Sequence, residues 1–290
     1  MRPGRRRGRP VVLLATALGG AALVALVAGG LAAPAGAVVN GTRTPIATAP
    51  FAVQLVAGGD TFCSGSLIRP RVVLTAAHCL AGTRRARVFV GRQDTQGTDG
   101  VEIKAVSSTY DKRVGGKRGT TSAGLAASSD VGLVELARDV TEVLPIALGG
   151  PEHASLLAPG RMLTVTGWGV VGSNDAARES SASRTLRSAT APVRSAAFCR
   201  GRLRASTRGI VCVGRLRRPV PGACFGDSGG PLYASTPAGA IQVGVVSSSP
   251  VASCGRDTTF YARVQSGPAR TWIDRHLTAE GRLRGGRALR

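Results

Sequence analysis

A serine flanked by glycines and a histidine far upstream are the residues of this chain best suited to chemistry. Ser228 lies in Cys-Phe-Gly-Asp-Ser-Gly-Gly-Pro at 224–231, and His78 lies in Leu-Thr-Ala-Ala-His-Cys at 74–79. A serine hydroxyl becomes a strong nucleophile only when a neighbouring imidazole can accept its proton. Glycines around Ser228 allow a sharp turn whose N–H groups converge on one point, as an oxyanion hole requires. The two motifs predict nucleophilic catalysis by a serine.

The elements that must position these side chains are short strands. Beyond residue 37, apolar runs of a few residues are separated by Gly, Pro, Ser and Asn, and several alternate apolar with small or polar residues. Helical periodicity is convincing only near 269–277, and a brief helix after His78 is the one other candidate. An all-β fold follows, and closed barrels would leave no strand edge exposed. Examples of the apolar runs are 51–56, 72–74, 88–90, 131–136, 163–165 and 241–246.

Residues 1–37 have the pattern of a secretory signal peptide. Arginines crowd residues 2–9, residues 11–33 are apolar and uncharged, and Ala35-Gly36-Ala37 fits the small-x-small cleavage rule. We therefore expect a secreted, extracellular protein. An uncleaved membrane anchor is the alternative, although Gly-Gly pairs within the apolar stretch weaken it as a spanning helix. The arginine run also resembles a twin-arginine signal weakly.

The chain is strongly basic. Its 290 residues include 38 Lys and Arg against 16 Asp and Glu, for a formal net charge of +22. Such a protein attracts polyanions nonspecifically, whether its charge reflects a compositional bias toward Ala, Gly and Arg or a selected surface. The sequence has no basic stripe interleaved with aromatic residues, so specific nucleic-acid binding is not indicated.

Six cysteines are dispersed along the chain without the close pairs of a zinc site. Their even number favours disulfide bonds, which need the oxidising compartment that an export signal provides. These residues are Cys63, Cys79, Cys199, Cys212, Cys224 and Cys254.

These motifs, with Asp130 opening Asp-Val-Gly-Leu-Val-Glu-Leu, resemble the trypsin- and chymotrypsin-like serine endopeptidases from Val38 to about Leu277. The resemblance implies that Ser228 is the nucleophile, His78 the general base and Asp130 the acid that orients it. Other candidates fit less well, because none of the other acids begins a comparable apolar strand and neither other histidine lies in such a motif. These are Asp94, Asp99, Asp111, His153 and His276.

The family's fold is two packed six-stranded antiparallel β-barrels with a C-terminal helix. We expect the first barrel in 38–148, the second barrel and helix in 149–280, and a frayed basic tail in 281–290. Residues 111–129 and 172–185 are expected to form mobile loops, because they are rich in Gly, Ser, Thr and Arg.

The resemblance assigns supporting roles as well. The N–H groups of Gly226 and Ser228 match the oxyanion hole, Ser247 matches a serine that supports Asp130 and begins the pairing with extended substrate, and Trp168 matches a packing residue. An ordinary strand residue is the alternative for Ser247. The implied disulfides are Cys63–Cys79, Cys199–Cys212 and Cys224–Cys254.

Activation in this family needs a new apolar N-terminus whose ammonium pairs with the aspartate before the serine, here Asp227. Val38-Val39-Asn40-Gly41 resembles such a start and directly follows the cleavage signal. We expect signal peptidase to release Val38, with a later protease as the alternative. Without its partner Asp227 would be a buried unpaired charge.

The residues that resemble the substrate pocket favour small or aliphatic side chains. Gly222 stands where family members that cut after Arg or Lys have an aspartate, so that specificity is not expected. Side chains at Ser249 and Thr259, where glycines are common, should narrow the pocket as in elastase-like members. Calcium is doubtful, because Arg92 stands where calcium-binding members have a carboxylate, although Asp94, Asp99 and Glu102 lie nearby in the sequence. No cofactor or metal is expected.

The sequence therefore predicts a secreted, monomeric serine endopeptidase that acts on proteins or peptides through an acyl-enzyme, with protein inhibitors as further partners. Two alternatives stay open. One is a catalytically silent homologue that works as a binding protein, and the other is a polyanion-binding surface protein in which the peptidase fold is secondary.

Overall fold

The computed structural model describes residues 38–83, 86–112, 114, 128–170, 182–203, 207–215, 217, 220–249 and 254–289. The predicted signal peptide and most of the two predicted mobile loops lie outside these residues. Within the described ranges, no helix is both long and apolar enough to cross a membrane.

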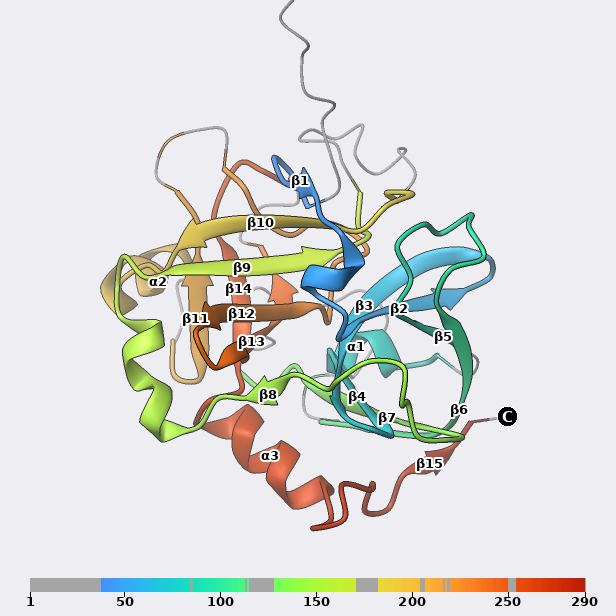
Figure 1. Cartoon of the computed structure of the whole chain (residues 1–290). Helices are drawn as coiled ribbons and strands as arrows, with labels where there is room; N and C mark the ends of the chain where they lie inside the picture. The colour runs from blue at the N-terminus through green and yellow to red at the C-terminus, as the bar shows by residue number, and fades with distance from the viewer. Residues whose placement is uncertain are drawn as a thin grey trace, which may run out of the picture. The chain divides into compact units, whose positions relative to one another are not determined.

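The first barrel is a closed sheet of six antiparallel strands in the order β6-β5-β2-β3-β4-β7, closed by pairing of β6 with β7 (Figure 1). Alternating side chains explain the strand state: along β6, Ile103 and Ala105 are buried while Glu102 and Lys104 are exposed. The strands are β2 Ala52–Ala57, β3 Asp60–Arg69, β4 Val72–Thr75, β5 Arg87–Val90, β6 Val101–Tyr110 and β7 Gly132–Leu136.

The second barrel has six strands in the order β10-β9-β12-β13-β14-β11. Its ends meet where Val193 bridges to Val213 and the Arg194 N–H donates to Cys212 O at 2.9 Å. The strands are β9 Met162–Gly167, β10 Arg187–Pro192, β11 Ile210–Val213, β12 Pro231–Thr236, β13 Gly239–Ser248 and β14 Thr259–Arg263. The prediction of two six-stranded barrels is confirmed.

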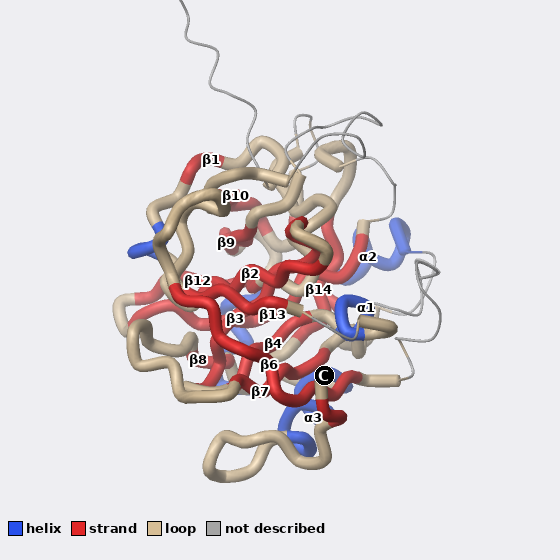
Figure 2. Tube along the Cα trace, turned by 90° about the vertical axis from the view of Figure 1, so that its right-hand side faces the viewer, coloured by secondary structure: helices blue, strands red, loops and turns tan. Residues whose placement is uncertain are grey.

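Short elements link and cover the barrels. Figure 2, with strands red and helices blue, shows how little of the described chain is helical. From α3, Ala269, Trp272 and Ile273 enter the same hydrophobic core as the first barrel. The remaining elements are β1 Thr42–Arg43, which pairs with β10, β8 Ala147–Leu148, which pairs with β13, the 3-10 helices η1 Ile46–Thr48 and η2 Pro151–Leu157, and the helices α1 Ala77–Leu80, α2 Ala196–Leu203 and α3 Pro268–His276.

The C-terminal tail is ordered, so the expectation of fraying is wrong for residues 281–289. Its strand β15, Arg287–Ala288, pairs antiparallel with β6 at Ser108 and Ser107. Arg282 forms an ion pair with Glu135 at 2.7 Å, and Leu283 and Leu289 pack against the core. The physical reason lies in β5, which pairs with β6 only over Val101–Lys104 and leaves the rest of that edge to the tail.

Candidate active site

Strand pairing brings His78 to Asp130. Thr75 at the end of β4 pairs with Gly132 at the start of β7, so α1, which follows β4, lies beside the residues that precede β7. The His78 ring Nδ1 lies 2.7 Å from Asp130 Oδ2, and the His78 backbone N–H donates to Asp130 Oδ1 at 3.0 Å. The carboxylate therefore fixes both the backbone and the ring of the histidine.

Asp130 is fully buried and receives a third hydrogen bond. Ser247 Oγ, on β13 of the second barrel, donates to Asp130 Oδ2 at 2.6 Å. Three hydrogen-bond donors fix the orientation of this buried carboxylate. With Nδ1 donating its proton to this carboxylate, Nε2 of a neutral His78 carries the free lone pair and can accept a proton.

The pKa of His78 reflects two opposed effects. Burial of the imidazole lowers it, while the charge of Asp130 and the hydrogen bond that the ring donates to that carboxylate raise it. The two contributions of Asp130 together prevail, so the pKa of His78 lies above its ordinary value of 6.5. The site therefore stabilises the imidazolium that would form during proton transfer.

The turn that carries Ser228 depends on its glycines. Gly226 and Gly229 have φ of +92° and +82°, in the left-handed region that favours glycine. A Cβ at Gly226 would lie 2.9 Å from the Cα of Gly169, and one at Gly229 would collide with Thr75 Oγ1. The sequence pattern around the serine is thus dictated by both backbone conformation and close packing.

The same turn is held against the histidine motif. Ser228 O accepts a hydrogen bond from the Ser64 N–H at 2.8 Å and lies 3.6 Å from Sγ of Cys79, the residue after His78. Ser64 Oγ also donates to Gly226 O at 2.9 Å. Sequence reasoning missed this support by Ser64, whose one signal was its position directly after Cys63.

Two N–H groups in the turn are free to bind an anion. Those of Asp227, Gly229 and Gly230 each donate to a backbone carbonyl. In the part of the chain that the structure describes, the N–H groups of Gly226 and Ser228 donate to no acceptor. These are the two groups that the family resemblance assigns to an oxyanion hole.

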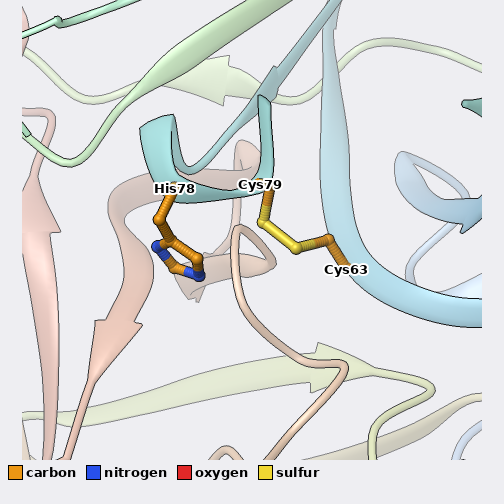
Figure 3. Close-up of side chains that lie close together, drawn as sticks. All are labelled: Cys63, His78 and Cys79. Carbon is orange, nitrogen blue, oxygen red and sulfur yellow. A yellow bond between two sulfur atoms is a disulfide. The ribbon is translucent and has the colours of Figure 1, made fainter. Parts of the chain in front are cut away.

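The disulfides brace this region. Figure 3 shows His78 extending from α1 beside the Cys63–Cys79 bond, which ties α1 to β3. Cys199–Cys212 joins α2 to β11, and Cys224–Cys254 joins the serine turn to the segment before β14. These pairs are the ones that the resemblance implies.

The described residues offer no suitable metal site. The group of potential ligands found among them is Cys63, His78 and Cys79, whose ligand atoms lie within 4.8 Å of one another. Both sulfurs are committed to the disulfide, and His78 Nδ1 is committed to Asp130. Thiolate ligation is therefore impossible while the bond is intact.

The loop between β5 and β6 does not fit calcium either. Carbonyl oxygens are ligands that Ca²⁺ prefers, but here a guanidinium binds them: Arg92 Nη2 donates to Thr95 O at 2.7 Å and Nε to Asp94 O at 3.1 Å. The Arg92 guanidinium also lies 4.0 Å from the centre of the Phe89 ring. A second cation at this place would be repelled.

Asp227 is buried next to Val38, the first residue that the structure describes. Its carboxylate accepts hydrogen bonds from the N–H groups of Gly169 at 2.8 Å and Cys224 at 2.9 Å, and from that of Val38. Burial raises the pKa of Asp227 to about 7, although these three donors oppose the rise. Val38 is itself fully buried. The Val38 nitrogen is thus already beside the acid with which activation would pair it.

Gly222 and Thr259 face each other. A Cβ on Gly222 would lie 2.8 Å from Thr259 Oγ1, and Thr259 is buried. Ser249 Oγ lies 3.4 Å from Thr258 O, to which it donates. Thr259 therefore occupies the space next to Gly222, the position at which the family resemblance would expect an aspartate in a protein that cuts after Arg or Lys.

Comparisons with known proteins agree with this geometry. A family model described as Trypsin matches residues 38–273. Chymotrypsin-like elastase family member 1 of Canis lupus familiaris is 30% identical over 247 residues, which cover 82% of this chain and 91% of that protein. Glucanase inhibitor protein 4 of Phytophthora infestans is 30% identical over 236 residues, with coverage of 80% and 84%. The structure of neuropsin, a serine protease expressed in the limbic system of mouse brain, matches with a TM-score of 0.64 and 26% identity, covering 81% of this chain and 97% of that one.

Proposed function

Because this chain belongs to the trypsin family of serine endopeptidases, we propose that it is secreted and that Ser228, His78 and Asp130 form its catalytic triad. The observation that carries the proposal is the hydrogen-bonded chain from Ser247 through Asp130 to His78, next to a serine turn with two free N–H groups. The three disulfides are consistent with an extracellular protein.

In the proposed reaction, Ser228 Oγ attacks the carbonyl carbon of the scissile peptide bond while its proton passes to His78 Nε2. The carbonyl oxygen becomes an oxyanion that accepts hydrogen bonds from the Gly226 and Ser228 N–H groups, each worth about 3 kcal/mol to the transition state. His78 then gives the proton to the leaving amine, and an acyl-enzyme remains. Water then gives a proton to His78 as its oxygen attacks the ester carbonyl, and His78 returns that proton to Ser228 Oγ as the ester bond breaks and the acid leaves.

We propose that the enzyme cleaves after small or aliphatic residues and not after Arg or Lys. A cationic side chain entering beside Gly222 would leave its hydration shell without meeting a carboxylate there. The hydroxyl of Thr259 lies against the same position and reduces the space. One methylene in such a pocket changes discrimination by about 1 to 3 kcal/mol, so a range of small residues is accepted.

We also propose that cleavage before Val38 completes the site. The Val38 nitrogen, an amide in the uncut chain, would become an ammonium beside Asp227 and neutralise a buried carboxylate. Since Asp227 directly precedes Ser228, its ionisation and hydrogen bonding bear on the turn that presents the nucleophile. N-terminal sequencing of the secreted protein tests the position of the cut, and a start upstream of Val38 would contradict it.

A second candidate is a family member that binds proteins without cleaving them. It is favoured by one relative, whose name describes an inhibitor of a glucanase. The two candidates differ in the reactivity of Ser228. A biotinylated alkyl phosphonate with an alanine-like side chain should label the processed protein at Ser228, while an arginine-like phosphonate should label it far more slowly.

The matched controls are Ser228→Ala, which removes the nucleophile, and Ser235→Ala, which removes an exposed hydroxyl on β12. Labelling should be lost in the first variant and kept in the second. Correctly processed, folded protein that reacts with neither phosphonate would favour the binding protein.

A further inference from the structure

We propose that the C-terminal strand completes a pocket on the first barrel that binds a small organic phosphate or sulfate ester. The pocket has a volume of about 680 Å³ and is lined by three segments of the chain. These are Leu80 and Thr83 from α1 and the turn after it, residues 108–110 and 112 from the end of β6 and beyond, and residues 285 and 287–289 from the tail. None of them belongs to the proposed triad, oxyanion hole or substrate pocket.

The pocket lies where the strands β5 and β15 leave part of the edge of β6 without a partner strand. Strand β5 pairs with one edge of β6 as far as Lys104. Further along the same edge, β15 pairs only with Ser107 and Ser108. On that edge, no other described strand pairs with Thr109 or Tyr110. The tail reaches the edge through Gly285, which has φ of +67° and can turn without steric cost.

The charge that lines the pocket is positive. Among the described residues that line the pocket, the charged ones are Lys112 and Arg287. Both are exposed, and neither makes an ion pair with any residue that the structure describes. Arg282, earlier in the tail, is by contrast paired with Glu135. Asp111 does not line the pocket, is buried, and takes part in another interaction. The pocket thus carries an uncompensated potential that attracts anions.

The other lining groups select among anions. The lining also includes four residues with hydroxyl groups, Thr83, Ser108, Thr109 and Tyr110, and two apolar residues, Leu80 and Leu289. The Thr83 hydroxyl already donates to Cys79 O at 2.8 Å. A guanidinium, an ammonium and several hydroxyls suit a tetrahedral oxyanion with many acceptor sites. The apolar wall suits a carbon skeleton, and the volume lies in the range of pockets for small molecules. A phosphate or sulfate ester combines both features, and the two groups share the chemistry that the pocket recognises.

The scarcity of lysine allows a direct test. The chain has three lysines, Lys104, Lys112 and Lys117. Lys104 is exposed on β6 but does not line the pocket, so it serves as an internal control. Secreted protein carrying Ser228→Ala would be acetylated with and without glucose 6-phosphate, glucose 6-sulfate or inorganic phosphate, at ionic strength held constant with chloride. We expect acetylation of Lys112 to slow severalfold with the esters and that of Lys104 to stay unchanged.

Matched variants measure the affinity. Isothermal titration calorimetry with glucose 6-phosphate should give binding about tenfold weaker for Arg287→Gln than for the parent protein. Arg161→Gln, which removes the same charge from an exposed position before β9, should bind as the parent does. If Arg287→Gln lowers the melting temperature, Lys112→Gln, outside the paired strand, replaces it.

Equal protection of Lys104 and Lys112, or equal weakening by the two arginine variants, would mean general attraction to a basic surface and would overturn the proposal. So would the absence of measurable binding by all three probes. Inorganic phosphate binding as tightly as the ester would restrict the site to the free anion and overturn the role of the apolar wall. Since the protein tested has no nucleophile, none of these results depends on peptidase activity.

Discussion

Cutting the chain before Val38 should change how the stability of the fold depends on pH. In the uncut chain the buried Asp227 has a pKa of about 7, against an ordinary value of 3.8. Because the pKa is higher in the folded than in the unfolded state, this group favours folding most at low pH, and the contribution is lost as pH rises through that interval. A difference of one pKa unit corresponds to about 1.4 kcal/mol, so the contribution of Asp227 to the free energy of unfolding differs by about 4 kcal/mol between low and high pH.

A free ammonium at Val38 should abolish most of this dependence. A positive charge beside Asp227 stabilises the ionised carboxylate and lowers its pKa toward or below the ordinary value. The cut protein should therefore keep its stability over the pH range in which the uncut protein loses it. The difference in free energy of unfolding between the two forms should be about 1 kcal/mol near pH 4.5 and about 4 kcal/mol near pH 7.

Urea unfolding at several pH values measures this difference. The two forms would begin at Val38 and at Ala35, both with Ser228→Ala to prevent self-cleavage. Uncut protein with Asp227→Asn is the control, because an amide cannot ionise and its curve should lack the fall above pH 4 that Asp227 causes. If the free energies of unfolding of the two Asp227 forms run parallel from pH 4.5 to 7, the Val38 nitrogen does not govern the ionisation of Asp227.

Three further predictions concern the site and its supports. Asp130→Asn should lower kcat by about 10⁴-fold, the loss typical of the triad aspartate. It should also shift the acid limb of the pH profile of kcat/KM to lower pH, because the charge that raises the pKa of His78 is gone. An unchanged acid limb would contradict this. Thr259→Gly should raise kcat/KM for peptides with Phe before the scissile bond by about tenfold or more relative to Ala, as measured with fluorogenic substrates, whereas an unaltered ratio would mean that Thr259 does not limit the pocket. Arg92→Ala should lower the free energy of unfolding by about 2 kcal/mol, while a chelator should leave the melting temperature of the parent protein unchanged; a drop on chelation would reveal a bound metal after all.

The parts of the site that the sequence predicted are those written in short contiguous motifs. The glycines beside Ser228 stand out because the turn tolerates no side chain at Gly226 and Gly229. His78 and Asp130 stand out because each lies next to a strand, and the pairing of β4 with β7 joins them. The contributions of Ser64 depend instead on packing between the barrels, which a single position in the sequence does not reveal.

Elements without a strong local pattern could not be predicted in the same way. Strand β10, Arg-Ser-Ala-Thr-Ala-Pro, has no β-branched apolar residue, and it is a strand because it pairs with β9 along its whole length. Strand β15 covers two residues, Arg287 and Ala288, and forms because an open edge lies nearby. Pairing with distant strands, and not the local sequence, therefore makes both segments strands.

Each end of the folded chain adds a strand to the barrel that the other half of the chain forms. Strand β1 comes from the first residues of the described fold and joins the second barrel, while β15 comes from the last and joins the first barrel. All six strands of the first barrel are complete by Leu136, yet the edge of β6 beyond its pairing with β5 has no partner strand until Arg287 and Ala288 have been made. Until then this edge can pair with a strand of another molecule, so the pairing with β15 removes one route by which the first barrel could aggregate.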